Sequence, residues 1–186
     1  MARARLARGD LDRCFEVFKV SAFRLETLRT YAVPAGDEQL RAFRLGRPLP
    51  GRAVRADPWL CRVTGTTAAG KSWQRIRVLG RPLTEHECAQ LLGYAEAAGA
   101  GEVIRIADRS LHPELAVLAR DFWLFDAGTA RPFAALLSHD PAGAYLGAEM
   151  TAEPAVLMAC VTARNLARQY SVPLGDYLAR LKAETW

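Results

Sequence analysis

The string Gly65–Ser72 (GTTAAGKS) has the residue spacing of a phosphate-binding loop, G-x-x-x-x-G-K-[ST]. In such a loop, backbone N–H groups and the N-terminus of the following helix face the phosphates, so a helix must come directly after it. The residues after Ser72 (WQRIRV) instead alternate between two faces and predict a strand. We therefore interpret Lys71 as the point where a helix ends and a strand begins, not as a nucleotide ligand.

The three histidines give no pattern of nucleophilic catalysis. His112 precedes a proline and His139 lies in the turn sequence SHDP, whereas a catalytic triad needs groups that converge from separate elements. We expect these two and His86 to have surface or capping roles. Carboxylates such as Asp108 and Asp121 are numerous. The sequence does not say which of them converge, so general acid–base chemistry stays open.

Arginines at alternating positions are the most informative chemistry-bearing residues. Arg75 and Arg77 share one face of the strand expected over 73–78, and Arg105 lies on the next strand. A buried charge without a partner costs several kcal/mol. These arginines therefore face solvent, pair with acidic residues such as Glu102 or Asp121, or form a surface that binds an anion. Trp73 and Trp123 offer aromatic area for stacking nearby, although a core position is also open for Trp123.

The elements that position these residues follow from periodicity and capping signals. Asp57-Pro58 is typical of a helix start, and Thr84 with Glu87 forms a capping-box sequence. We expect helices over 10–20, 37–45, 58–69, 84–98, 153–170 and 174–183. We expect strands over 73–78, 102–107, 121–125, 131–137 and 144–150. The fold class is α+β: one mixed sheet with a C-terminal antiparallel meander, flanked by helices, plus a small N-terminal helical arm.

Three segments describe the expected domain organisation. Residues 1–9 form a disordered basic tail, and residues 10–55 form the N-terminal helical arm and a Pro/Gly/Arg-rich linker. Residues 56–186 form the main α+β domain. We expect the arm to pack on this domain as one compact unit.

Composition sets the broad class of the protein. The 186 residues are 51% hydrophobic and 24% charged, as in a soluble single domain, which excludes a disordered or membrane-embedded chain. The formal net charge of +5 suits phosphate or carboxylate partners. The four cysteines show no metal spacing, so we expect reduced thiols and no metal site. The N-terminus carries no apolar signal segment, and we expect a cytoplasmic protein.

Four strings of the sequence carry a family resemblance, and they span most of the chain: SAFRLE at 21–26, RIRV at 75–78, DFWLFD at 121–126 and LGAE at 146–149. In these strings the chain resembles the actinobacterial family of domain of unknown function 6879. The resemblance implies a regulatory or accessory role, because many members are encoded beside helix-turn-helix regulators. The segment Glu85–Gln90 departs from the family pattern, so a ligand or partner contact on this helix would be altered here.

The order of elements also looks like that of effector domains related to phospholipase D. The catalytic H-x-K-x-x-x-x-D pattern of that group is absent, so this likeness implies binding without hydrolysis.

The strings and the arginine-bearing strands together give the candidate ligand-binding residues: Arg24, Glu26, Arg75, Arg77, Arg105, Trp123 and Asp126. The expected function is a non-catalytic regulatory or accessory module that binds an anionic small molecule, a partner protein or a second copy of the chain. No cofactor and no membrane are expected. The alternative is an enzyme of a specialised-metabolite pathway, such as an aminoacyl-tRNA-dependent transferase that contacts RNA, which the net positive charge and the arginine-rich N-terminus favour.

Overall fold

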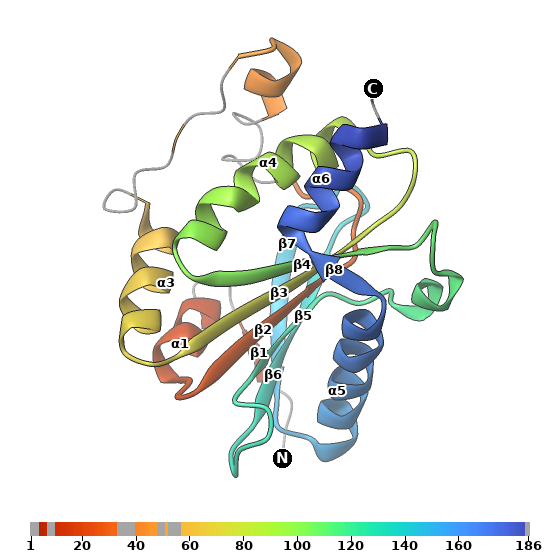
Figure 1. Ribbon diagram of the computed structural model, residues 1–186. Coiled ribbons are helices and arrows are strands. Elements are labelled where there is room, and N and C mark those ends of the chain that lie inside the picture. Colours follow the sequence, from red (N-terminus) through yellow and green to blue (C-terminus); the bar gives the residue numbers. More distant parts are fainter. Residues whose placement is uncertain (1–3, 7–9, 33–39, 48–50, 52–56, 185–186) are drawn as a thin grey trace.

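The computed structural model describes residues 4–6, 10–32, 40–47, 51 and 57–184 (Figure 1). The strands are β1 Ala4–Leu6, β2 Ser21–Glu26, β3 Ser72–Leu79, β4 Glu102–Asp108, β5 Phe122–Phe125, β6 Phe133–His139, β7 Tyr145–Thr151 and β8 Ser171–Pro173. The helices are α1 Asp10–Val17, α3 Pro58–Ala68, α4 Glu85–Gly99, the 3₁₀ helix η1 Pro113–Val117, α5 Pro154–Gln169 and α6 Leu174–Glu184. Residues 40–44 form one further helical turn.

All eight strands belong to one mixed sheet with the order β1-β7-β6-β5-β2-β3-β4-β8. Strands β2, β3 and β4 are parallel, and the chain crosses from β3 to β4 through α4. Strands β5, β6 and β7 form the antiparallel meander that the sequence predicts. The α+β fold class with one mixed sheet is therefore confirmed.

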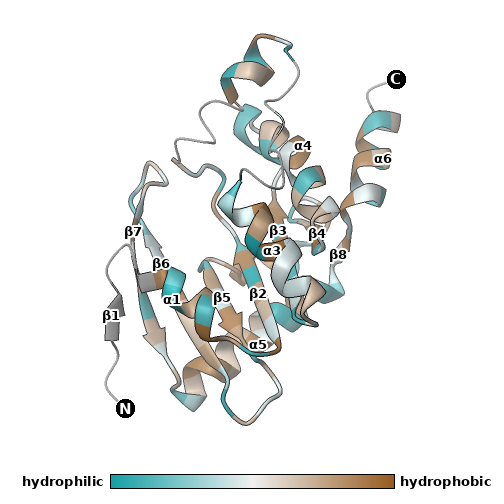
Figure 2. Ribbon diagram, turned by 90° about the vertical axis from the view of Figure 1, so that its left-hand side faces the viewer, coloured by the Kyte–Doolittle hydropathy of each residue, from teal (hydrophilic) through white to brown (hydrophobic). Residues whose placement is uncertain are grey.

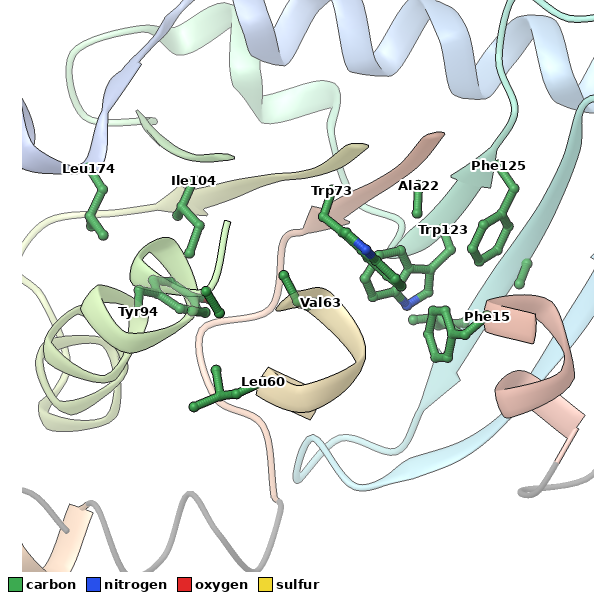
Figure 3. Packing of buried hydrophobic residues seen from close by; sticks show 14 of the residues in the cluster. Phe15, Ala22, Leu60, Val63, Trp73, Tyr94, Ile104, Trp123, Phe125 and Leu174 are labelled. Carbon is green, nitrogen blue, oxygen red and sulfur yellow. The ribbon is translucent and has the colours of Figure 1, made fainter. Parts of the chain in front are cut away.

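Helices cover the sheet on both faces, and each face has its own apolar core. On one face, α1, α3, α4 and α6 cover an apolar core (Figure 3). In it, Phe15 of α1 packs against Trp123 and Phe125, and Leu174 of α6 lies beside Ile104 of β4. On the other face, α5 packs against residues that include Phe23 and Ile76. In Figure 1, α5 lies on the opposite side of the strands from α1 and α3, and Figure 2 shows apolar residues gathered on the strands between these helices.

The N-terminal segment contributes strands to the sheet as well as helix α1. Strand β2, for which the sequence predicted no element, lies between β5 and β3 in the middle of the sheet. Ala4–Leu6, expected in a disordered tail, pairs with β7 as strand β1. Strand β8 was also missed, because a three-residue strand carries no periodicity. Much of the expected linker, together with the start of the helix predicted at 37, lies outside the described residues.

The junction at Lys71 is as the sequence predicted. Helix α3 ends at Ala68, Gly70 adopts a φ of 86°, and β3 begins at Ser72. The Nζ atom of Lys71 donates to the carbonyl oxygen of Phe18 at 2.7 Å and lies 4.2 Å from the centre of its ring. Without a helix after the loop, no helix N-terminus faces a phosphate here, and Lys71 closes a junction between two segments of the chain.

Both predicted helix starts are formed. The side chain of Asp57 accepts a hydrogen bond from the backbone N–H of Leu60 at 2.9 Å. Thr84 accepts from the backbone N–H of Glu87, and Glu87 accepts from that of Thr84, which completes the capping box of α4. These caps fix where α3 and α4 leave the sheet, and both helices contribute to the site described next.

Candidate functional site

A pocket of about 380 Å³ lies on the face of the sheet that α1, α3 and α4 cover. Strands β2, β3, β5 and β6 contribute residues to its floor, and the three helices contribute its walls. The aromatic side chains that line it are Phe15, Tyr31, Trp59, Tyr94, Trp123 and Tyr145. Four of the seven residues predicted as a site lie here: Arg24, Glu26, Arg75 and Trp123.

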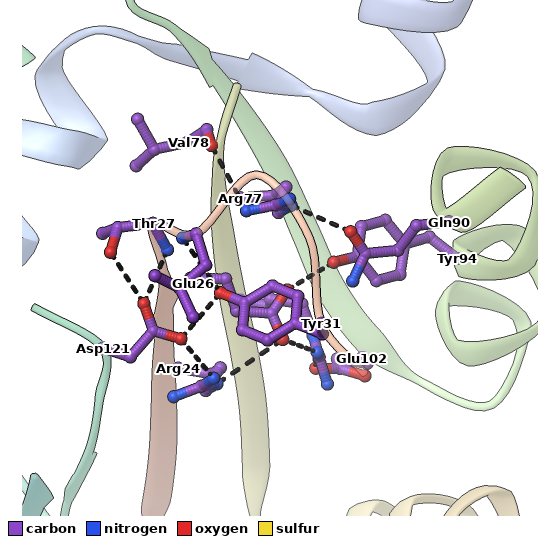
Figure 4. A network of polar contacts seen from close by, with 12 residues as sticks. Arg24, Glu26, Thr27, Tyr31, Arg77, Val78, Gln90, Tyr94, Glu102 and Asp121 are labelled. Carbon is purple, nitrogen blue, oxygen red and sulfur yellow. Dashed lines mark hydrogen bonds and ion pairs between the residues drawn. The ribbon is translucent and has the colours of Figure 1, made fainter. Parts of the chain in front are cut away.

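The floor of the pocket holds a chain of buried ion pairs (Figure 4). Arg24 donates Nη2–H to Asp121 Oδ2 at 2.7 Å and Nε–H to Glu26 Oε1 at 3.4 Å. Arg75 donates Nη1–H to Glu26 and Nε–H to Glu102 Oε1 at 2.7 Å. The sequence left three options for Arg75: exposure to solvent, pairing with acidic residues, or a surface that binds an anion. In the structure, Arg75 pairs with acidic residues.

Arg77 is fully buried behind Tyr31. Its Nε–H donates to Gln90 Oε1 at 2.9 Å, and its guanidinium carbon lies 5.1 Å from the centre of the Tyr31 ring. Gln90 and Tyr31 line the pocket, whereas Arg77 does not. Arg77 therefore influences the pocket through its contacts with Gln90 and Tyr31 and through its positive charge.

Two tyrosines complete the floor by donating to the carboxylates. The hydroxyl of Tyr94 donates to Glu26, and that of Tyr31 donates to Asp121 Oδ2 at 2.6 Å. Burial, and then the charge of Glu26, raises the pKa of both tyrosines, so they remain neutral donors. The backbone N–H of Tyr31 donates to Nε2 of His86 at 3.2 Å. His86 is therefore buried and holds the pocket wall, and the expected surface role was wrong.

Glu26, Arg24 and Arg75 in the floor are ionised. Burial opposes ionisation of Glu26, but Arg75, Arg24 and Arg77 together with the Tyr94 hydrogen bond lower its pKa to about 2. Burial likewise opposes the charge of Arg24, but Asp121 and Glu26 outweigh it and raise its pKa. We call Arg24, Glu26, Arg75, Arg77, Glu102 and Asp121 the charge cluster. Three positive and three negative side chains make it neutral as a whole.

Two donors of the charge cluster have no partner within the described part of the chain, Nη1 of Arg24 and Nη2 of Arg77, and of these two residues Arg24 lines the pocket. Arg24 is 5% exposed, and its Nη1 atom is buried with no hydrogen-bond partner among the described residues. Arg24 lines the pocket, and its guanidinium carbon lies 5.8 Å from the centre of the Trp123 ring. A buried N–H without an acceptor costs about 1–3 kcal/mol, and more on a charged group. This atom is the feature of the pocket that most needs a ligand.

His139 lies in the wall of the pocket, although the sequence indicated a surface turn. Its ring centre lies 5.5 Å from that of Tyr31 and 5.9 Å from that of Tyr145. Burial lowers the pKa of His139, so it is neutral at neutral pH. The turn interpretation failed because β6 extends through His139, two residues beyond the predicted end of that strand.

Besides Arg77, two predicted site residues lie outside the pocket. Arg105 pairs in register with Ile76, so it points to the opposite face of the sheet from Arg75, and its guanidinium donates to the hydroxyl and carbonyl oxygens of Ser171. Asp126 has a φ of 51° and accepts hydrogen bonds from the backbone N–H groups of Lys19, Val20 and Ser21. These contacts hold strand ends together, and neither residue faces a ligand site.

Replacing Asp126 by alanine is expected to lower the free energy of unfolding by about 2–4 kcal/mol, because three backbone N–H groups lose a charged acceptor and alanine is strained at positive φ. Asparagine tolerates this backbone conformation and keeps one acceptor oxygen, so Asp126→Asn is the matched control and should cost less than half as much. Urea denaturation of both variants measures the difference. Equal losses would contradict this role for the oxygen atoms.

The sequence missed several residues of the pocket: Phe15, Tyr31, Trp59, Gln90, Tyr94 and His139. A signal existed for two of them, because Gln90 and Tyr94 are four residues apart and therefore lie on one face of α4. Gln90 belongs to Glu85–Gln90, the segment that is expected from its sequence to differ from the family pattern. Glu87 in the same segment is buried and pairs with Arg29 at 2.9 Å, so this segment is a structural part of the pocket surroundings.

The described residues contain neither a metal-binding cluster nor a helix that could span a membrane. They contain no group of three or more His, Cys, Asp or Glu side chains arranged to hold a metal ion. Among the same residues, no helix has the length and apolar character needed to cross a membrane.

Comparison with known proteins identifies the family of the chain. No curated protein and no solved structure gave a match. A family profile described as Domain of unknown function (DUF6879) matches residues 9–179. This range covers most of the chain and includes every element that lines the pocket. The chain therefore belongs to the DUF6879 family, as the strings at 21–26, 75–78, 121–126 and 146–149 indicated.

Proposed function

We propose that the protein is a non-catalytic accessory or regulatory module that binds an anionic small molecule in the pocket between α1, α3, α4 and the sheet. The volume of about 380 Å³ lies in the range of small-molecule sites, roughly 300–1,000 Å³. The walls are aromatic and the floor carries a few fixed polar groups, which is the usual composition of such sites.

The observation that carries this proposal is the Nη1 atom of Arg24. It is a donor on a permanently charged group, it is buried, and it has no partner among the described residues. The other guanidinium nitrogens of Arg24 are held by Asp121 and Glu26, which fixes the orientation of the side chain. A negatively charged acceptor in the pocket would form a charge-assisted hydrogen bond with a donor that is already in place.

The charge cluster supports binding more than catalysis. A general acid or base works best when its pKa lies near the working pH. Glu26 has a pKa of about 2, and the pKa values of Tyr31 and Tyr94 are raised, so these groups do not exchange protons near neutrality. Arg75 and Arg77 are engaged inside the protein and do not form an outward basic surface for RNA.

The test is a two-dimensional NMR titration of the full chain with a fragment set of aryl carboxylates, aryl phosphates and their neutral analogues. The indole N–H signals of Trp59 and Trp123 report on the pocket, and that of Trp73, whose Nε1–H donates to Thr66, reports on the core below. We expect anionic fragments to shift the first two signals. Arg24→Lys should weaken this response at least tenfold, because lysine cannot reproduce the Nη1 donor.

Arg105→Lys is the matched control, because Arg105 lies on the opposite face of the same sheet. It should leave the fragment response unchanged. Fragment shifts that gather away from Trp59 and Trp123, or an Arg24→Lys protein that binds as well as the wild type, would contradict the proposed function. Co-purified RNA whose release depends steeply on salt would favour the enzyme alternative instead.

A further inference from the structure

We infer that the ligand carries a single negative charge, on a carboxylate, attached to a planar aromatic body. This inference rests on the proposed function and names the class of molecule that the same pocket takes. It follows from three features of the pocket: the unused donor atom Nη1 of Arg24, the charges beside this atom, and the arrangement of the aromatic side chains.

The first feature is that Arg24 offers the unused N–H groups of one nitrogen, Nη1, beside two carboxylates. Asp121 Oδ2 lies 2.7 Å from Nη2 of Arg24, and Glu26 Oε1 lies 3.4 Å from Nε. An acceptor on Nη1 therefore sits on a guanidinium that already faces two negative charges. A single charge gains a charge-assisted hydrogen bond there, whereas a second charge on the same group meets the repulsion of both carboxylates.

The second feature is that the charged residues lining the pocket and their ion-pair partners add no net positive charge. The charge cluster is neutral as a whole, and His139 is neutral because burial lowers its pKa. Beside the pocket, Arg62 packs over Phe15 and pairs with Asp12 at 2.9 Å, so this pair adds no net charge. A phosphate monoester, which carries close to two charges at neutral pH, is therefore poorly compensated, and a carboxylate fits better.

The third feature is that three aromatic side chains that line the pocket contact one another, and a flat ring of a ligand can pack against them. The ring centres of Phe15 and Trp59 are 5.5 Å apart, those of Trp59 and Trp123 are 5.7 Å apart, and those of Phe15 and Trp123 are 5.0 Å apart. Trp123 also lies beside Arg24. A planar aromatic body that packs edge-on or offset-stacked against Trp123 would keep its carboxylate close to the guanidinium of Arg24, and aromatic pairs prefer these two arrangements to a face-to-face sandwich.

Isothermal titration calorimetry of the full chain at pH 7.5 with three probes of one shape tests this inference. The probes are 2-naphthoate with one charge, 2-naphthyl phosphate with close to two, and 2-naphthamide with none. We expect 2-naphthoate to bind at least tenfold more tightly than either of the others. In Arg24→Lys the advantage over the amide should fall at least fivefold, and Arg105→Lys should keep it. Circular dichroism checks that each variant is folded.

The outcomes separate this inference from the proposed function. Binding of the phosphate as tightly as the carboxylate overturns the single-charge inference and leaves anion binding standing. Equal binding of the amide and the carboxylate overturns both the inference and the anionic character of the proposed function. If none of the three probes binds the wild-type protein, the aromatic-body inference fails, and the NMR titration with the wider fragment set then decides the proposed function.

Discussion

Replacing Arg75 by methionine is expected to lower the free energy of unfolding by about 3–5 kcal/mol, because it removes the cation that pairs with both Glu26 and Glu102 while these carboxylates stay buried. Methionine keeps much of the apolar stem, so the loss reports on charge more than on packing. Chemical denaturation measures it. The matched control is Arg44→Met at the surface, where the ion pair with Glu85 is more than half exposed, and the loss there should stay below about 1 kcal/mol.

The pH dependence of the same variant separates charge from packing. The pKa of Glu26 is lowered from 4.5 to about 2 on folding, so the stability that it contributes is complete above pH 4.5 and is lost as the pH falls from 4.5 to 2. Without Arg75, the largest of the effects that lower this pKa is gone. The variant should therefore lose less stability than the wild type across that window. Parallel curves would contradict a role for Arg75 in holding Glu26 ionised.

Replacing Gly143 by alanine is expected to cost roughly 2–5 kcal/mol of stability and to weaken ligand binding at least tenfold. Gly143 has a φ of 85°, and a Cβ atom there would lie 2.2 Å from the carbonyl oxygen of Thr30. The Gly143 carbonyl also accepts from the N–H of Ala32 at 3.1 Å. Any shift of this segment moves Tyr31, which forms a pocket wall and donates to Asp121.

Gly128→Ala is the control for Gly143→Ala, because Gly128 has nearly the same φ, 88°, and a Cβ atom there would meet no described atom within 4 Å. The control includes the cost of positive φ and lacks the clash. Thermal denaturation and calorimetry with 2-naphthoate compare the two variants. We expect Gly128→Ala to bind normally. Similar losses of stability and affinity in both would show that the contact between Gly143 and Thr30 does not position the pocket.

Local signals in the sequence were sufficient for most elements of the fold. The capping residues Asp57 and Thr84 mark helix starts that the structure has, and the alternation around Arg75 marks β3. Strand β2 was missed although Phe23 and Leu25 alternate with Arg24 and Glu26, because so short an alternating run does not by itself distinguish a strand from one turn of a helix. Its polar positions are themselves buried in the charge cluster, so they do not mark a solvent-facing side of the strand.

The sequence predicted a part of the candidate site, from the alternating arginines of one strand and from the strings of the family resemblance. Arg75 and Arg77 are two positions apart and point the same way, and Glu102 was among the partners considered for them. Arg105 was misplaced because its face depends on the register between β3 and β4, which one sequence does not give. Tyr31, Trp59 and His139 come from a loop, a helix and a meander strand. Only the tertiary fold brings them together.

The most direct test of ligand binding at Arg24 is a crystal structure of the protein with 2-naphthoate. We expect one carboxylate oxygen within hydrogen-bond distance of Nη1 of Arg24, and the naphthalene ring packed against Trp59 and Trp123. A complex in which the ligand occupies another part of the molecule, or lies in this pocket with its carboxylate turned away from Arg24, would contradict the proposed site.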